Sequence, residues 1–459
     1  MRVDELHGLR IAIWGFAREG RAALRFLRER DPGMAITVLD DAENARDADA
    51  PLIRGRASIA AAIDGFEVVV KSPGISLYDP VVVRARANGV RFTSLLNLWF
   101  AAAPTCRTIC VTGTKGKSTT TALIAHILRG VGWNAVAAGN IGVPVMELPR
   151  DGLDAAVIEV SSYQAADFDG QCDIAVLTSL HQEHLDWHGS VAAYRRDKLN
   201  LLRHARHAVI NRDALAVVGE TLDLDSLDLA TFAACSELHV NNRYLGRPHN
   251  LSNLAGALAV ARSLGLDPAA ALRAVEDFPP LPHRQQEIGE VHGVLYVDDS
   301  ISTTPEAAIA ALDVYQDRPA TVIIGGHDRG IDYGALVERL RAEPRPCVVL
   351  IDASGKRIHG LLGAGQCVRF AESMHEAVAQ AREMTPSGGV IVLSPAAPSY
   401  GRYRSFVERG EDFAVCAGLR EAFTIGAIDG TRCHCERSEA IPIEVRTPME
   451  IAASLRSSQ

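Results

Sequence analysis

The segment VTGTKGKSTTTALIAHIL, residues 111–128, carries the residue types that bind phosphate. A short β-branched run ends there, Gly113 and Gly116 follow, and an apolar-periodic helix begins next. Glycines let backbone N–H groups turn toward phosphate oxygens, and the amino end of the helix adds a favourable dipole. Lys117 would reach the β- and γ-phosphates, and the Ser118 hydroxyl would bind Mg²⁺. The segment predicts a nucleoside-triphosphate site, although the first glycine of the usual phosphate loop comes two residues late.

A second group of chemically active side chains lies downstream, in SLHQEHLDWHG. It contains His181, His184, Asp186 and His188. Clustered histidine and aspartate could bind Zn²⁺ in a metallohydrolase. Because zinc alone does not explain the phosphate loop upstream, the zinc hydrolase is kept only as an alternative.

The turn GFAREG, residues 15–20, joins a predicted strand to a predicted helix. It resembles the dinucleotide-binding fingerprint, but Ala17 replaces the second glycine, which lets a pyrophosphate approach closely. A nicotinamide-dependent dehydrogenase is therefore an alternative from a different class of enzyme.

Short β-branched runs alternate with helical patterns along most of the chain, which favours parallel sheets wound with helices. Strands are predicted at 9–14, 36–39, 66–70, 108–111, 155–158, 174–178, 294–297, 321–324, 347–351 and 389–393, and helices at 21–28 and 251–264. AAAPTC marks a boundary near residue 104, and the prolines of FPPLPHR, residues 278–284, mark a connector. We therefore predict α/β domains at 1–103, 104–284 and 285–427, and a mobile tail at 428–459.

Composition narrows the class of protein. The 459 residues are 47% hydrophobic and 22% charged, which suits globular domains with sizeable cores. The net charge of −9 comes without a basic stripe, so no nucleic acid is expected as a partner. Nine irregularly spaced cysteines fit reduced thiols rather than a disulfide framework. With no signal-peptide pattern and no long apolar run, we expect a soluble cytoplasmic protein that does not contact the membrane.

The short loop form GTKGKSTT resembles that of the Mur and folylpolyglutamate ligases. GNIG (139–142), EVSSYQ (159–164) and the segment from His184 to Lys198 match the same family in the same order. The resemblance covers roughly residues 8–425. It implies three α/β domains: a Rossmann-like domain that binds a UDP-sugar, a central phosphate-loop ATPase-type domain, and a Rossmann-like domain that binds the incoming amino acid.

The resemblance also implies the reaction. An ATP-dependent ligase phosphorylates a carboxylate of UDP-N-acetylmuramoyl-L-alanine and then joins it to glutamate during peptidoglycan precursor synthesis. Several phosphate charges meet a carboxylate in one site, and divalent cations neutralise them. The family uses two Mg²⁺ ions, and a lysine carbamylated by CO₂ ligates one of them. Lys198 in YRRDK matches that lysine.

Site residues follow from the same matches. The implied metal ligands are Ser118, Glu159, His184 and carbamylated Lys198. The implied catalytic residues are Lys117, His184 and Lys198, with His184 a candidate for the base that deprotonates the amine. The implied ATP contacts are Gly113, Thr114, Lys115, Gly116, Lys117, Ser118, Thr119, Asn250, Asn253, His283, Arg284 and Asp299. The implied substrate contacts are Phe16, Ala17, Asp40, Ser72, Pro73, Gly74, Asn140, Thr303, Arg329, Ser399, Tyr400 and Tyr403.

The third domain carries the evidence on the incoming amino acid. The D-glutamate-adding members have lysines where this chain has Ile301 and Arg329. DSISTTP, GGHDRG and SPAAPS instead resemble the subgroup that adds L-glutamate, whose product a partner epimerase then converts. Arg329 could pair bidentately with a glutamate carboxylate. We predict L-glutamate, with D-glutamate as the alternative.

Other functions stay open at this point. A folylpolyglutamate-type ligase shares the loop but has no use for the domain at 1–103, and a phosphate-loop kinase needs no glutamate. A non-catalytic binding module would not need the full set of phosphate and metal groups. We expect a monomer.

Overall fold

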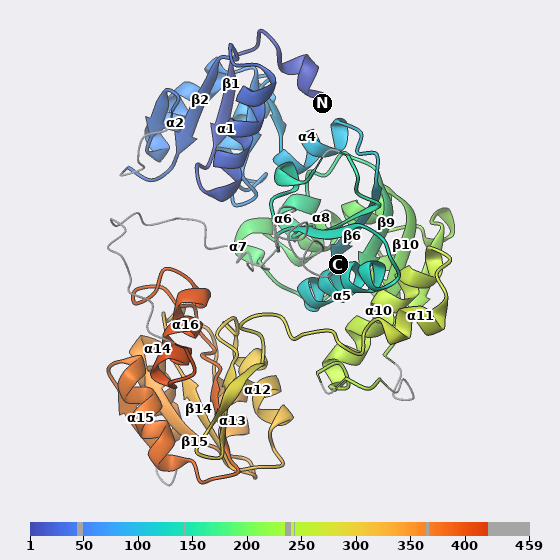
Figure 1. The fold of residues 1–459 in the computed structure, drawn as a ribbon. Helices are drawn as coiled ribbons and strands as arrows, with labels where there is room; N and C mark the ends of the chain where they lie inside the picture. Colours follow the sequence, from blue (N-terminus) through green and yellow to red (C-terminus); the bar gives the residue numbers. More distant parts are fainter. Residues whose placement is uncertain are drawn as a thin grey trace, which may run out of the picture. The chain divides into compact units, whose positions relative to one another are not determined.

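The computed structural model describes residues 1–43, 49–141, 143–149, 151–234, 240–242, 244–363 and 367–420 (Figure 1). The chain forms two compact units, the first comprising residues 1–278 and the second beginning at Pro279. The predicted tail at 428–459 lies outside the described residues.

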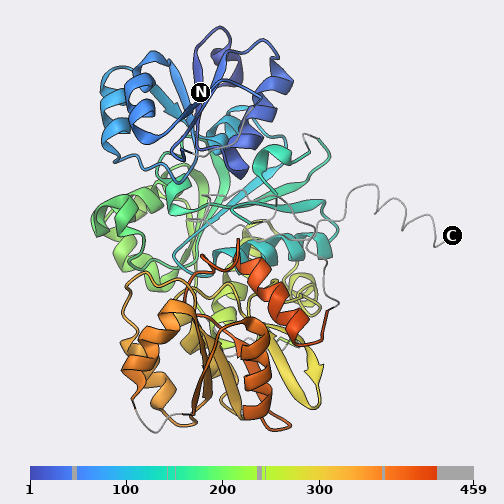
Figure 2. The same ribbon diagram turned by 90° about the vertical axis from the view of Figure 1, so that its left-hand side faces the viewer.

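The first sheet of unit 1 is parallel, with strand order β3-β2-β1-β4-β5. Alternate residues of the central strand β1 pack into two different cores. Ile11 and Ile13 face α1 and α4, whereas Ala12 and Trp14 face α2 and α3. Helices therefore cover both faces of this sheet (Figure 2). The elements are β1 (Ile11–Trp14), α1 (Arg18–Arg30), β2 (Ile36–Asp40), β3 (Leu52–Arg54), α2 (Arg56–Ala62), β4 (Val68–Lys71), α3 (Pro80–Ala87), β5 (Arg91–Thr93) and α4 (Leu95–Ala101).

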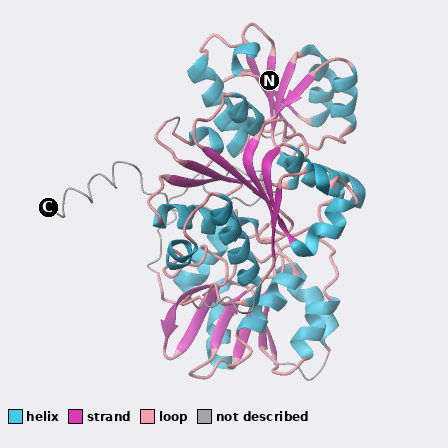
Figure 3. Cartoon of the chain, turned by 90° about the vertical axis from the view of Figure 1, so that its right-hand side faces the viewer, coloured by secondary structure: helices cyan, strands magenta, loops and turns pink. Residues whose placement is uncertain are grey.

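The second sheet of unit 1 is also parallel, with order β11-β10-β9-β6-β8-β7. Its central strands are almost wholly buried, as parallel strands between helical layers are (Figure 3). The strands are β6 (Arg107–Thr112), β7 (Ala135–Gly139), β8 (Ala155–Glu159), β9 (Cys172–Leu177), β10 (Ala205–Asn211) and β11 (Leu229–Phe232). The helices are α5 (Lys117–Gly130), α6 (Ser162–Ala165), α7 (Leu185–His188), α8 (Val191–Arg203), α9 (Leu215–Gly219), α10 (Pro248–Ser263) and α11 (Pro268–Arg273).

Unit 2 is built on a third sheet with order β12-β13-β17-β14-β15-β16, in which only β12 runs antiparallel to its neighbour. The strands are β12 (Gln286–Val291), β13 (Val294–Asp298), β14 (Ala320–Ile324), β15 (Cys347–Ile351), β16 (Val368–Ala371) and β17 (Val390–Leu393). The helices are α12 (Pro305–Val314), α13 (Gly334–Arg341), α14 (Asp352–Leu362), α15 (Met374–Met384) and α16 (Phe406–Cys416).

The structure confirms the predicted α/β class with parallel sheets, and every strand predicted from the sequence overlaps an observed one. Several strands went unpredicted, among them β7, whose sequence AVAAG has little β-branched character. The predicted connector contains the boundary between the units, which falls between Phe278 and Pro279. Within the described ranges, no helix combines the length and apolarity that a membrane span requires.

Candidate functional site

The predicted phosphate loop joins β6 to α5, and two of its glycines sit where a side chain cannot. Gly113 has a φ of +149°, and a Cβ there would lie 2.0 Å from Thr178 Oγ1. Gly116 has a φ of +87°, and a Cβ there would lie 2.3 Å from Asn253 Oδ1. Both the backbone conformation and the available space therefore demand glycine.

Residues that directly follow β9, together with Tyr194 of α8, hold this loop. Thr114 N–H donates to Ser179 O at 2.9 Å, and Lys115 N–H donates to Ser179 Oγ at 2.9 Å. Thr178 Oγ1 donates to Lys115 O at 2.6 Å. The Thr114 hydroxyl lies 2.8 Å from Tyr194 OH. The loop is thus preorganised at the carboxyl end of β6, where ligands bind in open parallel sheets.

Two lysines from different helices converge on this loop. Lys117 Nζ, on α5, donates to Gly113 O and to Thr114 O, both at 3.0 Å. Lys198 Nζ, on α8, donates to Gly113 O at 2.8 Å and is buried. Burial, followed by the neighbouring Lys117, holds the pKa of Lys198 well below its usual value. The neutral amine is therefore far more accessible at Lys198 than at an exposed lysine.

Glu159 ends β8 beside these lysines and is buried. Asn140 Nδ2 donates to Glu159 Oε1 at 3.0 Å, while Oε2 has no hydrogen-bond partner among the described residues. A buried carboxylate oxygen without a partner is costly unless a ligand completes it. The Glu159 carboxylate and the Ser118 hydroxyl, in the first turn of α5, are hard oxygen donors of the kind that Mg²⁺ prefers, so these residues fit a magnesium ion.

His184 precedes α7 in the left-handed region, with a φ of +55°. Burial lowers the pKa of His184 to about 4, against the opposing effect of Glu183. The imidazole is therefore neutral at pH 7 and able to ligate a cation. Its ring centroid lies 5.0 Å from that of Tyr163.

The histidine cluster does not form a zinc site. His188 is buried with both ring nitrogens engaged, Nδ1 with Asp197 at 2.7 Å and Nε2 with Ser162 Oγ at 3.0 Å. No group of three or more histidine, cysteine, aspartate or glutamate side chains is placed to hold a metal within the described part of the chain. Among the predicted magnesium ligands, only Glu159 and His184 are of these residue types. The predicted site therefore depends on Lys198 becoming an anionic ligand.

The predicted nucleotide-contacting asparagines lie on α10, which packs against α5. Asn253 Nδ2 donates to Asn250 Oδ1 at 3.1 Å, and Asn250 Nδ2 donates to Tyr244 O at 2.9 Å. Since Asn253 Oδ1 occupies the space beside Gly116, the structure brings Asn253 to the phosphate loop, with Asn250 buried behind it.

The predicted UDP-sugar residues gather at the carboxyl ends of β1, β2 and β4. Phe16 N–H donates to Asp40 Oδ2 at 2.8 Å, and Ser72 Oγ donates to Gly15 O at 2.8 Å. Ala17 is the N-cap of α1 without a side-chain cap, and Pro73 and Gly74 follow Ser72 after β4. This edge of the first sheet therefore presents the amino terminus of α1, while the Phe16 N–H is already bonded to Asp40.

Unit 2 holds the other predicted ATP contacts. Burial raises the pKa of Asp299 to about 6, although Asp299 accepts from Ser302 Oγ at 2.6 Å, Ser394 Oγ at 2.8 Å and Gln285 N at 3.0 Å. His283 Nδ1 lies 2.7 Å from Asp298 Oδ2. Arg284 Nε is buried without a hydrogen-bond partner among the described residues.

The structure brings only some of the predicted glutamate contacts together. Arg329 donates to Thr303 O at 2.9 Å, and the Tyr400 ring lies 5.8 Å from that of His327. Ser399 Oγ is buried without a hydrogen-bond partner among the described residues. The Tyr403 hydroxyl donates to Asp412 Oδ2 at 2.5 Å, so it is already engaged within unit 2.

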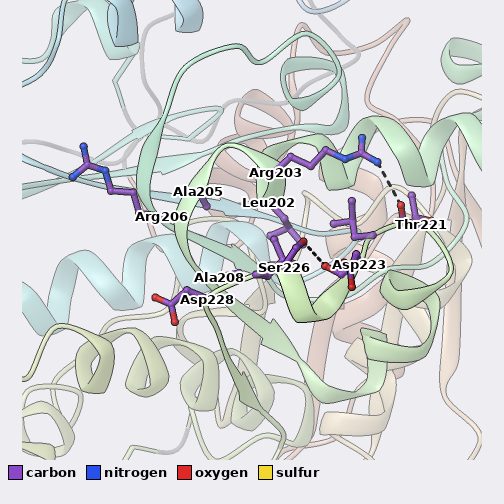
Figure 4. A pocket seen from close by; sticks show the side chains of 11 residues that line it. Leu202, Arg203, Ala205, Arg206, Ala208, Thr221, Asp223, Ser226 and Asp228 are labelled. Carbon is purple, nitrogen blue, oxygen red and sulfur yellow. Dashed lines mark hydrogen bonds between the residues drawn. The ribbon is translucent and has the colours of Figure 1, made fainter.

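A cavity of about 450 Å³ lies elsewhere in unit 1, between the end of α8, the start of β10 and residues 221–228 (Figure 4). Arg203 donates across it to Thr221 O at 3.4 Å. Because Ala205 is the first residue of β10, the cavity lies at the amino edge of the central sheet. The phosphate loop lies at the opposite, carboxyl edge.

Sequence reasoning missed the residues that support the loop. Thr178 and Ser179 follow β9, and Tyr194 lies on α8. Thr178 is the last residue of the strand predicted at 174–178. Because parallel strands beside a phosphate loop end at the same edge of the sheet, this position could have indicated that Thr178 lies next to the loop. No sequence signal marked Tyr194 as a partner of Thr114.

The fold and the loop define a nucleotide-phosphate-binding α/β protein, and comparison with known proteins identifies the family. Residues 111–234 match the Mur ligase middle domain, and residues 283–397 match the Mur ligase glutamate ligase domain. The chain belongs to the Mur ligase family. The nicotinamide, kinase and zinc-hydrolase alternatives are therefore set aside.

Relatives cover nearly the whole chain. UDP-N-acetylmuramoyl-L-alanine–L-glutamate ligase of Xanthomonas euvesicatoria pv. vesicatoria is 40% identical over 95% of this chain and 100% of its own. The ligase of the same name from Micromonospora sp. is 42% identical over 90% of this chain and 97% of its own. A UDP-N-acetylmuramate–alanine ligase from Thermotoga maritima has a similar fold, with a TM-score of 0.56, 20% identity, and coverage of 89% of this chain and 99% of that chain.

Proposed function

We propose that this enzyme uses ATP to join UDP-N-acetylmuramoyl-L-alanine to L-glutamate in peptidoglycan precursor synthesis. The convergence of Lys117, Lys198 and Glu159 on the loop from Gly113 to Ser118 carries this proposal. The printed names of the relatives supply the two substrates. ATP and the nucleotide-sugar are both cytoplasmic metabolites, so we place the reaction in the cytoplasm and expect a monomer to perform it.

The proposed reaction has two steps. The alanine carboxylate attacks the γ-phosphorus of ATP, an acyl phosphate forms, and ADP leaves. The glutamate amine then attacks the acyl carbon, and the tetrahedral intermediate expels phosphate. Lys117, held beside the Gly113 and Thr114 carbonyls, is placed to stabilise the charge that develops on the transferred phosphoryl group. Magnesium, when bound, would neutralise the phosphate oxygens.

We propose that Lys198 carries a carbamate. Its unprotonated amine adds to CO₂, which forms an N–C bond and releases one proton. The depressed pKa of Lys198 favours the amine form that this addition needs. The product is an anionic oxygen ligand beside Glu159 and His184, and these residues would then hold two magnesium ions together with Ser118.

We assign His184 to contact with metal or phosphate rather than to deprotonation of the amine. A pKa near 4 makes the imidazole a weak base toward an ammonium group. Its position before α7 places it beside Tyr163 and in electrostatic reach of Lys117 and Lys198.

The preference for L-glutamate rests on the third domain. The lysines of the D-glutamate-adding members are replaced by Ile301 and Arg329, and Arg329 lies against Thr303. Moving the cationic donor changes which carboxylate geometry can pair with it. A partner epimerase acting on the L-glutamate product is part of this proposal.

The test is phosphate release by the purified enzyme with ATP, Mg²⁺, UDP-N-acetylmuramoyl-L-alanine and either isomer of glutamate. We expect rapid release with L-glutamate and little with D-glutamate or without an amino acid. Equal or faster release with D-glutamate would overturn the stereochemical assignment. No ADP with any amino acid would overturn the ligase assignment.

A further inference from the structure

Residues 72–79 lie between β4 and α3. They connect the predicted UDP-sugar site of the first sheet to α7 and α8 of the second, the helices beside His184 and Lys198. The segment begins with Ser72, Pro73 and Gly74, the expected acceptor contacts. Trp187 Nε1 donates to Pro73 O at 3.1 Å, and Ser76 Oγ donates to Trp187 O at 2.8 Å. At the other end of the segment, Tyr78 OH lies 2.8 Å from both carboxylate oxygens of Asp197.

Asp197 is the centre of a mostly buried polar chain. Its carboxylate accepts from Tyr78 and pairs with His188 Nδ1 at 2.7 Å, and His188 Nε2 lies 3.0 Å from Ser162 Oγ. Arg196 donates to Tyr78 OH at 2.7 Å at the outer end. Buried carboxylates with several charge-assisted hydrogen bonds hold their neighbours in one geometry. Asp197 therefore fixes residues 72–79 against α7, α8 and the start of α6.

The same segment reaches both groups that we assign to the reaction. Asp197 directly precedes Lys198 on α8. The Tyr78 ring packs edge-on against Trp187 with centroids 6.1 Å apart, and Trp187 stacks on Tyr163 at 4.8 Å. Tyr163 in turn contacts the His184 ring. One path leads from Tyr78 to Lys198 through a hydrogen bond, and the other leads to His184 through packed rings.

We propose that Tyr78 is a positioning residue: its hydroxyl, through Asp197, sets the acceptor carboxylate in register with Lys198 and His184. This inference rests on the proposed ligase function. Acceptor affinity comes from the start of the segment, whereas the Tyr78–Asp197 bond sets the direction of attack. Small displacements of a bound reactant lower the rate of the chemical step strongly.

If the Tyr78 hydroxyl had a purely structural role, its removal would lower the stability of unit 1, and the rate would fall only with the Tm. Tyr78 is 39% exposed, so losing its oxygen opens no core cavity. The ion pair between Lys71 and Asp167, at 3.0 Å, and the hydrogen bond from Gln164 Nε2 to Glu19 Oε1, at 3.1 Å, also join the first sheet to the second. The fold of unit 1 therefore keeps its own supports in a Tyr78→Phe variant.

The experiment compares steady-state kinetics of full-length Tyr78→Phe, Asp197→Asn and the double variant with those of the parent. We expect kcat to fall by about 10- to 100-fold in each single variant, from displaced reactants. The KM for ATP should change by less than about twofold, because Lys117 and the loop from Gly113 to Ser118 supply the proposed ATP contacts. The double variant should be no slower than Asp197→Asn alone, since the Tyr78 hydroxyl acts through Asp197, whereas Asp197→Asn also changes the contact with His188.

Tyr296→Phe is the matched control. It removes a hydroxyl that accepts a hydrogen bond from Arg382 at 2.7 Å in unit 2, and it should leave kcat unchanged. An unchanged kcat in Tyr78→Phe, multiplicative losses in the double variant, or a loss of rate that tracks a lower Tm would each overturn the positioning role. A parent enzyme that forms no ADP would instead overturn the proposed function, so the two failures are distinct.

Discussion

Lys198 is the residue whose chemical state decides the proposed metal site. It is buried against the Gly113 carbonyl, and its pKa is depressed by burial and by Lys117. We predict that Lys198→Ala lowers ligase activity by about 100-fold or more, because an anionic metal ligand is lost. Depletion of CO₂ should slow the parent enzyme reversibly, and added bicarbonate should restore it.

Lys356→Ala is the control for this change, since Lys356 is an exposed lysine on α14. It should keep parental activity and the parental response to CO₂. Normal turnover in Lys198→Ala would remove the carbamate from the mechanism. A CO₂ response that persists in Lys198→Ala would assign it to another group.

Glu19 gives a pH-dependent prediction at the first turn of α1. Burial raises the pKa of Glu19 to about 7, more than Lys71 lowers it. Between pH 4.5 and about 7 the folded state binds more protons at Glu19 than the unfolded state, so stability falls as pH rises through this range. Glu19→Gln cannot ionise and should escape that loss. Its stability relative to the parent should improve by about 1–2 kcal/mol from pH 5 to pH 8.

Thermal unfolding at pH 5 and at pH 8 measures this difference. Glu29→Gln is a suitable control, because Glu29 lies on the same helix α1, in its last turn. A stability difference between Glu19→Gln and the parent that is independent of pH would contradict the raised pKa.

At the scale of elements, the phosphate loop depends on glycine at two positions. A Cβ at Gly116 would collide with Asn253 Oδ1, and the φ of +87° is strained for any other residue. We predict that Gly116→Ala raises the KM for ATP or abolishes activity, with a loss of kcat/KM of about 100-fold. Steady-state kinetics with varied ATP measure this effect.

Gly360→Ala is the matched control. No neighbouring atom lies within 4 Å of a Cβ at this position on α14, so activity should be unchanged. Parental kinetics in Gly116→Ala would show that the loop can adopt another conformation when nucleotide binds.

Elements were predictable where the sequence pattern reflects burial. β6, β8, β9 and β17 each contain three or four consecutive apolar residues, and each strand lies within two residues of its predicted bounds. The partners of the site were not predictable, because they come from distant elements. Asn140 was predicted to contact substrate, and the structure adds a bond to Glu159 from 19 residues away. Tyr78 lies 119 residues before Asp197 and belongs to none of the motifs, although Asp197 itself lies in YRRDK.

At the scale of the whole molecule, the predicted ATP contacts are divided between the two units. The phosphate loop, Asn250 and Asn253 belong to residues 1–278, whereas His283, Arg284 and Asp299 belong to the unit that begins at Pro279. The connector at 278–284 carries Arg284 beside the boundary. We therefore expect a reaction that uses both predicted sets of residues to require domain closure when nucleotide and glutamate bind.

A variant of Arg284 tests whether residues of unit 2 take part in the reaction, because the hydrogen bonds of the Arg284 side chain within unit 2 are incomplete. Arg284 Nε is buried with no hydrogen-bond partner among the described residues, and Arg284 acts on the neighbouring Asp299 carboxyl, whose pKa is about 6. We predict that Arg284→Ala lowers kcat by about 50-fold or more, since a cation that meets the phosphates only on closure contributes to the transition state. The affinity of the resting enzyme for ATP should change by less than about threefold, because Lys117 and the loop supply it.

Arg369→Ala, at an exposed arginine on β16, should change neither quantity. Parallel losses of ATP affinity and kcat in Arg284→Ala would mean that both units contact the nucleotide before closure, and an unchanged kcat would exclude Arg284 from the reaction.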